Sequence, residues 1–78
     1  MRELRSIRLE LSELEAMRLC DVEGCDQATA GRHMGVSRGT VQRLLKRGRA
    51  KVVHALLESQ ALVIEERASH EDLYSNRG

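Results

Sequence analysis

Positively charged side chains are concentrated in the middle of this 78-residue chain, where no acidic residue accompanies them. Seven Lys or Arg and no Asp or Glu lie between Gln27 and Leu57, whereas the other 47 residues hold six Lys or Arg and all twelve Asp and Glu. The net charge of +1 therefore hides a strongly basic segment inside an acidic remainder. A block of cations of this kind attracts a polyanion.

The basic segment contains the residue types that bind DNA. Arg can fork to O6 and N7 of guanine, and Gln can fork to N6 and N7 of adenine. Lys, Arg and the N-termini of helices suit phosphates. The candidate DNA contacts are Gln27, Ser37, Arg38, Gly39, Thr40, Gln42, Arg43, Lys46, Arg47 and Arg49. Arg38, Gln42 and Arg43 are expected at base edges, and the later cations at phosphates. Gln27 is a phosphate candidate that could equally be a plain polar residue at a helix start.

The spacing of caps and turns predicts that these side chains stand on a helix-turn-helix motif. Asp26 is expected to cap a short helix that runs from Gln27 to about Met34. Gly35 then makes a tight turn, because glycine tolerates the left-handed backbone that a sharp interhelical turn requires. Ser37 starts a second helix that continues to Glu58. The first turns of this second helix would project outward and insert into the major groove.

Small and apolar residues in the same segment predict how the two helices pack. The small Gly31 permits a close crossing, and Val36 and Val41 are expected to fill the wedge between the helices. Apolar or small residues recur at three- and four-residue steps along the long helix: Val41, Leu44, Leu45, Gly48, Val52, Ala55 and Leu56. A solvated cationic face and a structural turn are each common by themselves. Their coincidence in one register favours DNA binding.

The ends of the chain predict two short strands around a first helix. Residues 3–10 and ALVIEE at 61–66 each show strand-like patterns. Between them, Ser12 is expected to open a helix through a capping box with Glu15, and this helix should fade near Val22. Its outer face is expected to be solvated. Residues 1–66 would form the domain, followed by a flexible C-terminal tail at residues 67–78.

Composition restricts the remaining classes of function. With no Phe, no Trp and one Tyr, the core must be thin, so a partner copy is expected to support it. Cys20 and Cys25 are interpreted as reduced, partly buried thiols, with a disulfide or metal site as the alternative. No catalytic set, metal cluster or cofactor-binding loop can be assembled, so we expect a non-enzyme without cofactors. No apolar run approaches the roughly 20 residues of a membrane span, and no signal peptide is evident, so a cytoplasmic location is expected.

The predicted fold is therefore an all-α helix-turn-helix domain of three helices, the last one long, with a minor two-stranded β-ribbon formed by the N- and C-terminal segments. The thin core and lone strands predict a two-fold homodimer, with residues 61–66 and the apolar side of the long helix at the interface. An intramolecular ribbon between residues 5–9 and 61–65 is the competing arrangement. The sequence alone does not separate the two.

Several segments of the chain resemble a known family. These are LSELEAMRLCDVEG, then DQATAGRHMGVSRGTVQRLL, then the R-x-K-V-x-x-A-L pattern of Arg49 to Leu56, and the closing ALVIE. They are similar to small prokaryotic proteins of unknown role that are classed as predicted DNA-binding proteins and look like region 4 of the sigma-70 factors. The resemblance covers roughly residues 7–66. It implies the fold and DNA binding, although Gly31 and Gly48 stand where this family usually has alanine, and Ser59-Gln60 replaces a glycine-containing turn.

Together these features predict a sequence-specific, non-catalytic protein that binds double-stranded DNA and regulates transcription. The alternative is a protein-interaction module that uses the same fold to dock on the transcription machinery. A DNA-binding protein would show a steep salt dependence and a preferred sequence, whereas a docking module would show neither.

Overall fold

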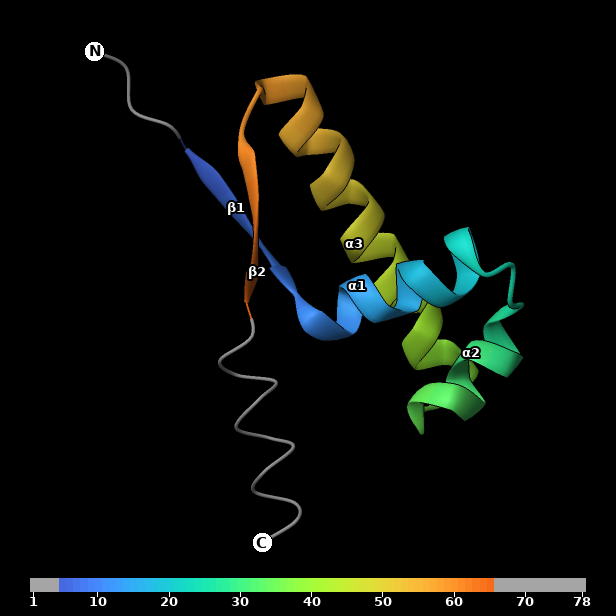
Figure 1. The fold of residues 1–78 in the computed structure, drawn as a ribbon. Coiled ribbons are helices and arrows are strands. Elements are labelled where there is room, and N and C mark those ends of the chain that lie inside the picture. The colour runs from blue at the N-terminus through green and yellow to red at the C-terminus, as the bar shows by residue number, and fades with distance from the viewer. Residues whose placement is uncertain (1–4, 66–78) are drawn as a thin grey trace, which may run out of the picture.

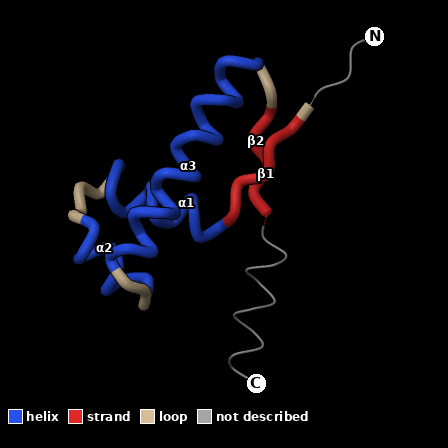
Figure 2. The backbone as a smooth tube through the Cα atoms, turned by 180° about the vertical axis from the view of Figure 1, so that it is seen from behind, coloured by secondary structure: helices blue, strands red, loops and turns tan. Residues whose placement is uncertain are grey.

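The computed structural model describes residues 5–65, with the helices gathered at one end and a small sheet beside the last turns of the long helix (Figures 1 and 2). The elements in chain order are β1 (Ser6–Glu10), α1 (Leu11–Met17), the π-helical turn η1 (Arg18–Val22), α2 (Gln27–Met34), α3 (Arg38–Glu58) and β2 (Ala61–Glu65). The predicted tail at residues 67–78 lies outside the described residues. Of the helices within residues 5–65, none has the length and apolar character that crossing a membrane requires.

The two terminal strands pair with each other within one chain, so the intramolecular ribbon is the arrangement that the structure adopts. They run parallel, with Ile7 opposite Leu62 and Leu9 opposite Ile64. The backbone N–H of Ala61 extends this ladder by donating to the carbonyl of Arg5 at 3.0 Å. Parallel strands require a long crossover, and here the whole helical region provides it.

The first helix begins two residues earlier than predicted and has a different cap. Glu10 is the residue before α1, and its backbone N–H donates to Oε1 of Glu13 at 3.0 Å. The predicted capping box between Ser12 and Glu15 is wrong, because Ser12 already lies inside the first helical turn. Glu15 instead accepts a 2.6 Å hydrogen bond from Arg18. The helical path ends at Val22 in η1, close to the predicted end.

The caps predicted for α2 and α3 are confirmed. Oδ1 of Asp26 accepts from the backbone N–H of Thr29 at 2.8 Å, and Oγ of Ser37 accepts from the N–H of Thr40 at 3.1 Å. Between the helices, Gly35 has the left-handed backbone that the turn requires, with φ of 74°. The long helix is continuous over 21 residues, Arg38 to Glu58.

The turn between α2 and α3 packs through its backbone. A Cβ atom at Gly31 would lie 2.7 Å from the carbonyl oxygen of Val36, and the N–H of Val36 donates to the carbonyl of Gly31 at 2.9 Å. The prediction that the Val36 side chain fills the wedge is wrong, because it is 38% exposed. Val41 is fully buried there, as predicted.

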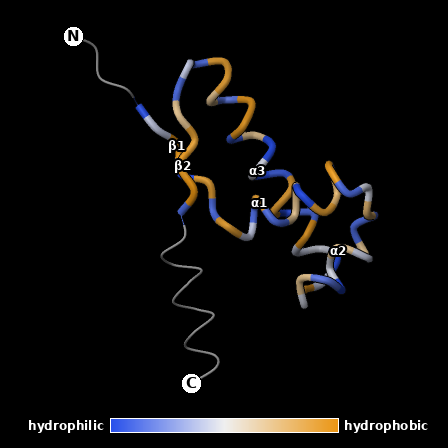
Figure 3. The backbone as a smooth tube through the Cα atoms, viewed as in Figure 1, coloured by the Kyte–Doolittle hydropathy of each residue, from blue (hydrophilic) through white to orange (hydrophobic). Residues whose placement is uncertain are grey.

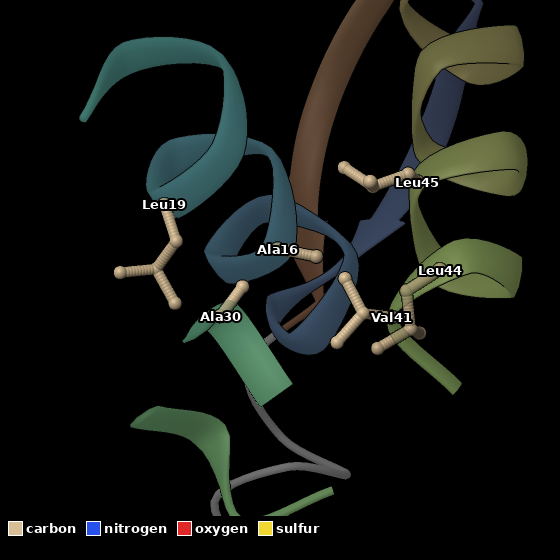
Figure 4. Packing of buried hydrophobic residues seen from close by; sticks show 6 residues of the cluster. All are labelled: Ala16, Leu19, Ala30, Val41, Leu44 and Leu45. Atoms are coloured by element: carbon tan, nitrogen blue, oxygen red, sulfur yellow. The ribbon is translucent and has the colours of Figure 1, made fainter. Parts of the chain in front are cut away.

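The core lies where α1, η1 and α2 meet the first half of α3 (Figure 4). Its buried members are Ala16, Leu19, Ala30, Val41, Leu44 and Leu45. In the last turns of α3 only Ala55 is buried, and Leu56, which was predicted to belong to the apolar stripe, is 75% exposed. The sheet therefore covers one narrow side of α3 and leaves Val53, Leu56 and Leu57 exposed. Figure 3 shows hydrophobic residues along the last turns of this helix.

Candidate nucleic-acid interface

The seven cations of the basic segment fall into two groups according to their partners. Three form ion pairs with acidic side chains of the N-terminal elements: Arg47, Arg49 and Lys51. The other four form no ion pair within residues 5–65: Arg32, Arg38, Arg43 and Lys46. All four of these unpaired cations of the basic segment lie on α2 or on the first half of α3.

The first group is organised around a carboxylate that the sequence did not single out. Glu13 is fully buried between α1 and α3. It accepts hydrogen bonds from Nζ of Lys51 at 2.7 Å, from Nε of Arg47 at 3.1 Å and from the N–H of Glu10 at 3.0 Å. Burial alone would raise the pKa of Glu13, but these hydrogen bonds outweigh it and lower the pKa below its ordinary value. Glu13 is therefore ionised at neutral pH, and the expectation that the outer face of the first helix is wholly solvated is wrong.

A glycine in α3 allows this carboxylate to lie so close. A Cβ atom at Gly48 would lie 3.3 Å from Cβ of Glu13 and 2.9 Å from Cε of Met17. The absence of a side chain at Gly48 thus lets α1 approach α3 closely, which places Glu13 within reach of the cations on either side.

Arg49 is paired in a similar way with the turn that follows α1. Its Nη2 and Nε donate to the two carboxylate oxygens of Asp21 at 2.6 and 3.2 Å, which is the two-point geometry that arginine forms best. The hydrogen bond from Arg49 lowers the pKa of Asp21, and Asp21 raises the pKa of Arg49. Two of the predicted phosphate contacts, Arg47 and Arg49, thus serve to hold α3 against the N-terminal elements.

The remaining predicted contacts on α3 form one exposed face. Arg38, Gly39, Gln42, Arg43 and Lys46 are all exposed. The α-helical repeat of 3.6 residues brings residues 39, 42, 43 and 46 to the same side of α3. The core residues of α3 point to the other side. The basic face is defined here as Gln42, Arg43 and Lys46 on this exposed side of α3 together with Arg38 at the start of the helix.

Two other predicted contacts help to shape the start of α3. The hydroxyl of Ser37 caps the helix and lies 3.0 Å from the hydroxyl of Thr40. Nη2 of Arg43 donates to Oγ1 of Thr40 at 3.3 Å. This bond places the Arg43 guanidinium beside the side chain of Thr40.

An open groove of about 580 Å³ runs between the start of α2 and the side of α3. It is lined by Cys20, Cys25, Asp26, Gln27, Ala28, Arg38, Leu45 and Arg49. The structure therefore brings Gln27 to the same groove as Arg38. Both cysteines are free and partly buried, as predicted. Burial, followed by the charge of Asp21, raises the pKa of the Cys20 thiol, so this thiol stays protonated.

The chain belongs to the family described as Protein of unknown function DUF134, whose model matches residues 2–71. A UPF0251 protein of Rhodospirillum rubrum is 46% identical over 65 residues, which cover 83% of this chain and 46% of the relative. A UPF0251 protein of Pyrococcus horikoshii is 50% identical over 58 residues, or 74% of this chain and 53% of the relative. The chain spans about half the length of these two curated relatives. No solved structure matches it.

Proposed function

We propose that this member of the DUF134 family is a sequence-specific, non-catalytic DNA-binding protein that regulates transcription, with α2 and α3 acting as a helix-turn-helix motif. The observation that carries the proposal is the separation of paired from unpaired cations. The cations beside the N-terminal elements are neutralised, whereas the basic face has no acidic partner within residues 5–65. Unpaired cations on one convex helix face can release counterions from DNA phosphates, which is the main source of affinity for DNA.

The geometry around the turn supports insertion of the first half of α3 into the major groove. The left-handed Gly35 and the Ser37 cap hold α2 and α3 against each other around buried Val41. The start of α3 carries no acidic side chain, so nothing in its first turn repels phosphate. In helix-turn-helix proteins the N-terminal part of the second helix contacts base edges while the first helix crosses the backbone.

The side chains of the basic face suit two different roles. Arg38, Gln42 and Arg43 occupy the first two turns, where an inserted helix meets base edges. Lys46 lies one turn later and suits the phosphate backbone, as does Arg32 on α2. Arg47 and Arg49 contribute less in this proposal, because each would have to share or release an acidic partner.

We further propose that the protein binds DNA as a two-fold homodimer. Two copies would present their basic faces about 34 Å apart, the length of one DNA turn. The operator would then consist of two half-sites related by a dyad.

The proposal is tested by selecting preferred sequences from a pool of random duplexes and then comparing two variants on the best sequence and on random DNA. Arg43→Ala should lose roughly 1–3 kcal/mol on the best sequence and much less on random DNA, because it removes base recognition. Lys46→Ala should weaken both by similar factors, because it removes a phosphate contact. Equal losses for Arg43→Ala on both DNAs would show that this arginine does not read bases.

A protein that selects no sequence and shows no salt-dependent binding would contradict DNA binding altogether. The result would favour the alternative, a module that docks on the transcription machinery. The exposed apolar side chains at the end of α3, Val53, Leu56 and Leu57, would suit such a protein partner.

A further inference from the structure

The outer edge of β2 is an open hydrogen-bonding edge made of apolar residues. In a parallel ladder alternate residues direct both backbone groups to the partner strand. The hydrogen bond from Ala61 to Arg5 and the observed register show that Ala61, Val63 and Glu65 direct their backbone groups toward β1. The N–H and C=O groups of Leu62 and Ile64 therefore point to the opposite edge, where the described part of the chain supplies no neighbouring strand.

We propose that this edge pairs antiparallel with the same edge of a second copy of the chain, with a two-fold axis at Val63. The open edge is self-complementary. Leu62 would exchange two backbone hydrogen bonds with Ile64 of the second copy, and Ile64 would do the same with Leu62 of the second copy. Val63 would face its own copy across the axis. The product is a four-stranded sheet in the order β1–β2–β2–β1.

The distribution of charge favours this edge over the edge of β1. Glu65 is the only charged residue of β2. Across the seam, which is the proposed contact between the two β2 strands, Glu65 lies opposite Ala61 of the second copy, so no like charges oppose each other. The outward residues of β1 include the charged Arg8 and Glu10, and charged residues protect an edge from pairing. In addition, the N–H of Glu10 is already bonded to Glu13.

Apolar side chains of β2 that are exposed in the single chain would be covered by this pairing. Leu62 is 37% exposed and Val63 is 46% exposed, although both are residues that strands usually bury. Pairing would place Leu62 beside Ile64 of the second copy on one face and the two Val63 side chains together on the other. Because a two-stranded sheet is marginal by itself and three or more strands are self-supporting, the pairing would also stabilise the ribbon.

Disulfide trapping tests the position of the axis. In a Cys20→Ser, Cys25→Ser background, Val63→Cys should give a covalent dimer under mild oxidation, because directly opposed residues of this kind have Cα atoms about 4.5 Å apart, within disulfide range. Leu62→Cys is the matched control in the same strand. It lies roughly 7–8 Å from its own copy across the seam, which is too far for a disulfide. Equal trapping of both variants, or none of Val63→Cys, would overturn the proposal.

Charge exchange provides an independent test by sedimentation at micromolar concentration. The parent should be dimeric, whereas Val63→Glu and Val63→Lys should each be monomeric, because like charges would meet on the axis. Mixing the two variants should restore a dimer. Val63→Glu leaves the single chain intact, since its carboxylate would face Arg8 across the ladder, and far-UV circular dichroism verifies the fold.

A monomeric parent would overturn the proposal. So would a dimer that Leu57→Glu dissociates and Val63→Glu does not, because the seam would then lie on α3. This proposal rests on the homodimer of the proposed function. None of these measurements involves DNA, so failure of this pairing and failure of DNA binding are distinguishable.

Discussion

Replacing Glu13 by glutamine, a side chain of nearly the same size and shape, should nevertheless lower the free energy of unfolding substantially. The carboxylate is fully buried and accepts two hydrogen bonds from cations and one from a backbone N–H. A hydrogen bond to a charged group contributes roughly 1.5–3 kcal/mol. The amide keeps one acceptor oxygen but turns an NH₂ group toward a cation. Because Arg47 and Lys51 remain partly exposed and can be resolvated, we expect a loss of about 2–3 kcal/mol, below the cost of stranding a wholly buried charge.

Glu15→Gln is the matched control, because Glu15 lies on the same helix and its ion pair with Arg18 is exposed to solvent. Removing an exposed ion pair should change stability little. Urea unfolding followed by far-UV circular dichroism at pH 7 measures the free energy of unfolding of the parent and both variants. If Glu13→Gln loses no more stability than Glu15→Gln, the ion pairs of Glu13 do not stabilise the packing of α1 on α3.

The same carboxylate predicts a pH dependence with a definite sign. The pKa of Glu13 in the folded chain lies below its ordinary value of 4.5. The unfolded chain therefore takes up the proton first as pH falls, so the stabilisation is fully present above the ordinary value and is lost below it. The difference in unfolding free energy between the parent and Glu13→Gln should be constant near neutral pH and shrink below about pH 4.5. A difference that grows on acidification would contradict this assignment.

Two further predictions concern the turn and the thiols. Gly31→Ala should destabilise the protein by roughly 1–3 kcal/mol, because its Cβ would lie 2.7 Å from a carbonyl oxygen of the turn. Gly39→Ala is the control: its Cβ would meet nothing closer than 3.9 Å, so it should stabilise the helix by up to about 1 kcal/mol. Thermal melts of the two variants that shift in the same direction would contradict the close contact at Gly31. Replacing both Cys20 and Cys25 by Ser should leave affinity for DNA unchanged in oxidising and reducing buffers, because both thiols are free and partly buried. A redox-dependent loss of binding in the parent protein would show that the thiols regulate it.

Local signals in the sequence were sufficient to predict the caps of α2 and α3 and the turn between these helices, although they misplaced the cap of α1. Asp26 and Ser37 satisfy the N–H groups of residues three positions away, and Gly35 supplies a backbone conformation that few other residues adopt. These interactions depend only on near neighbours in the chain. For the same reason, the bounds of α2 and α3 follow from the residue pattern.

Features that depend on distant segments could not be read in this way. The burial of Glu13 depends on Gly48, and its ion pairs join residues 34 and 38 positions apart. No local pattern distinguishes this glutamate from Glu15, because the difference lies in the packing: α3 covers Glu13, whereas Glu15 pairs with Arg18 at the surface. Leu56 continues the apolar period of α3, yet the sheet is too narrow to cover it.

The division of the basic segment into paired and unpaired cations also depends on distant parts of the chain. Counting charges indicates a strongly cationic segment, but only the packed structure shows that α1 and η1 bring acids to Arg47, Arg49 and Lys51. The sequence therefore identified the candidate residues without showing which of them have acidic partners.

The salt dependence of binding to random duplex DNA tests the central proposal most directly. Four cations of the basic segment have no ion pair within residues 5–65. Each phosphate contact contributes about −0.9 to the slope of log K against log salt concentration. Two of these cations, Lys46 and Arg32, are assigned to phosphates, so the proposal predicts a slope of roughly −1.8 for each bound chain. A slope of roughly −6, as expected if all seven cations contacted phosphates, would contradict the division into paired and unpaired cations. A slope near zero would contradict DNA binding itself.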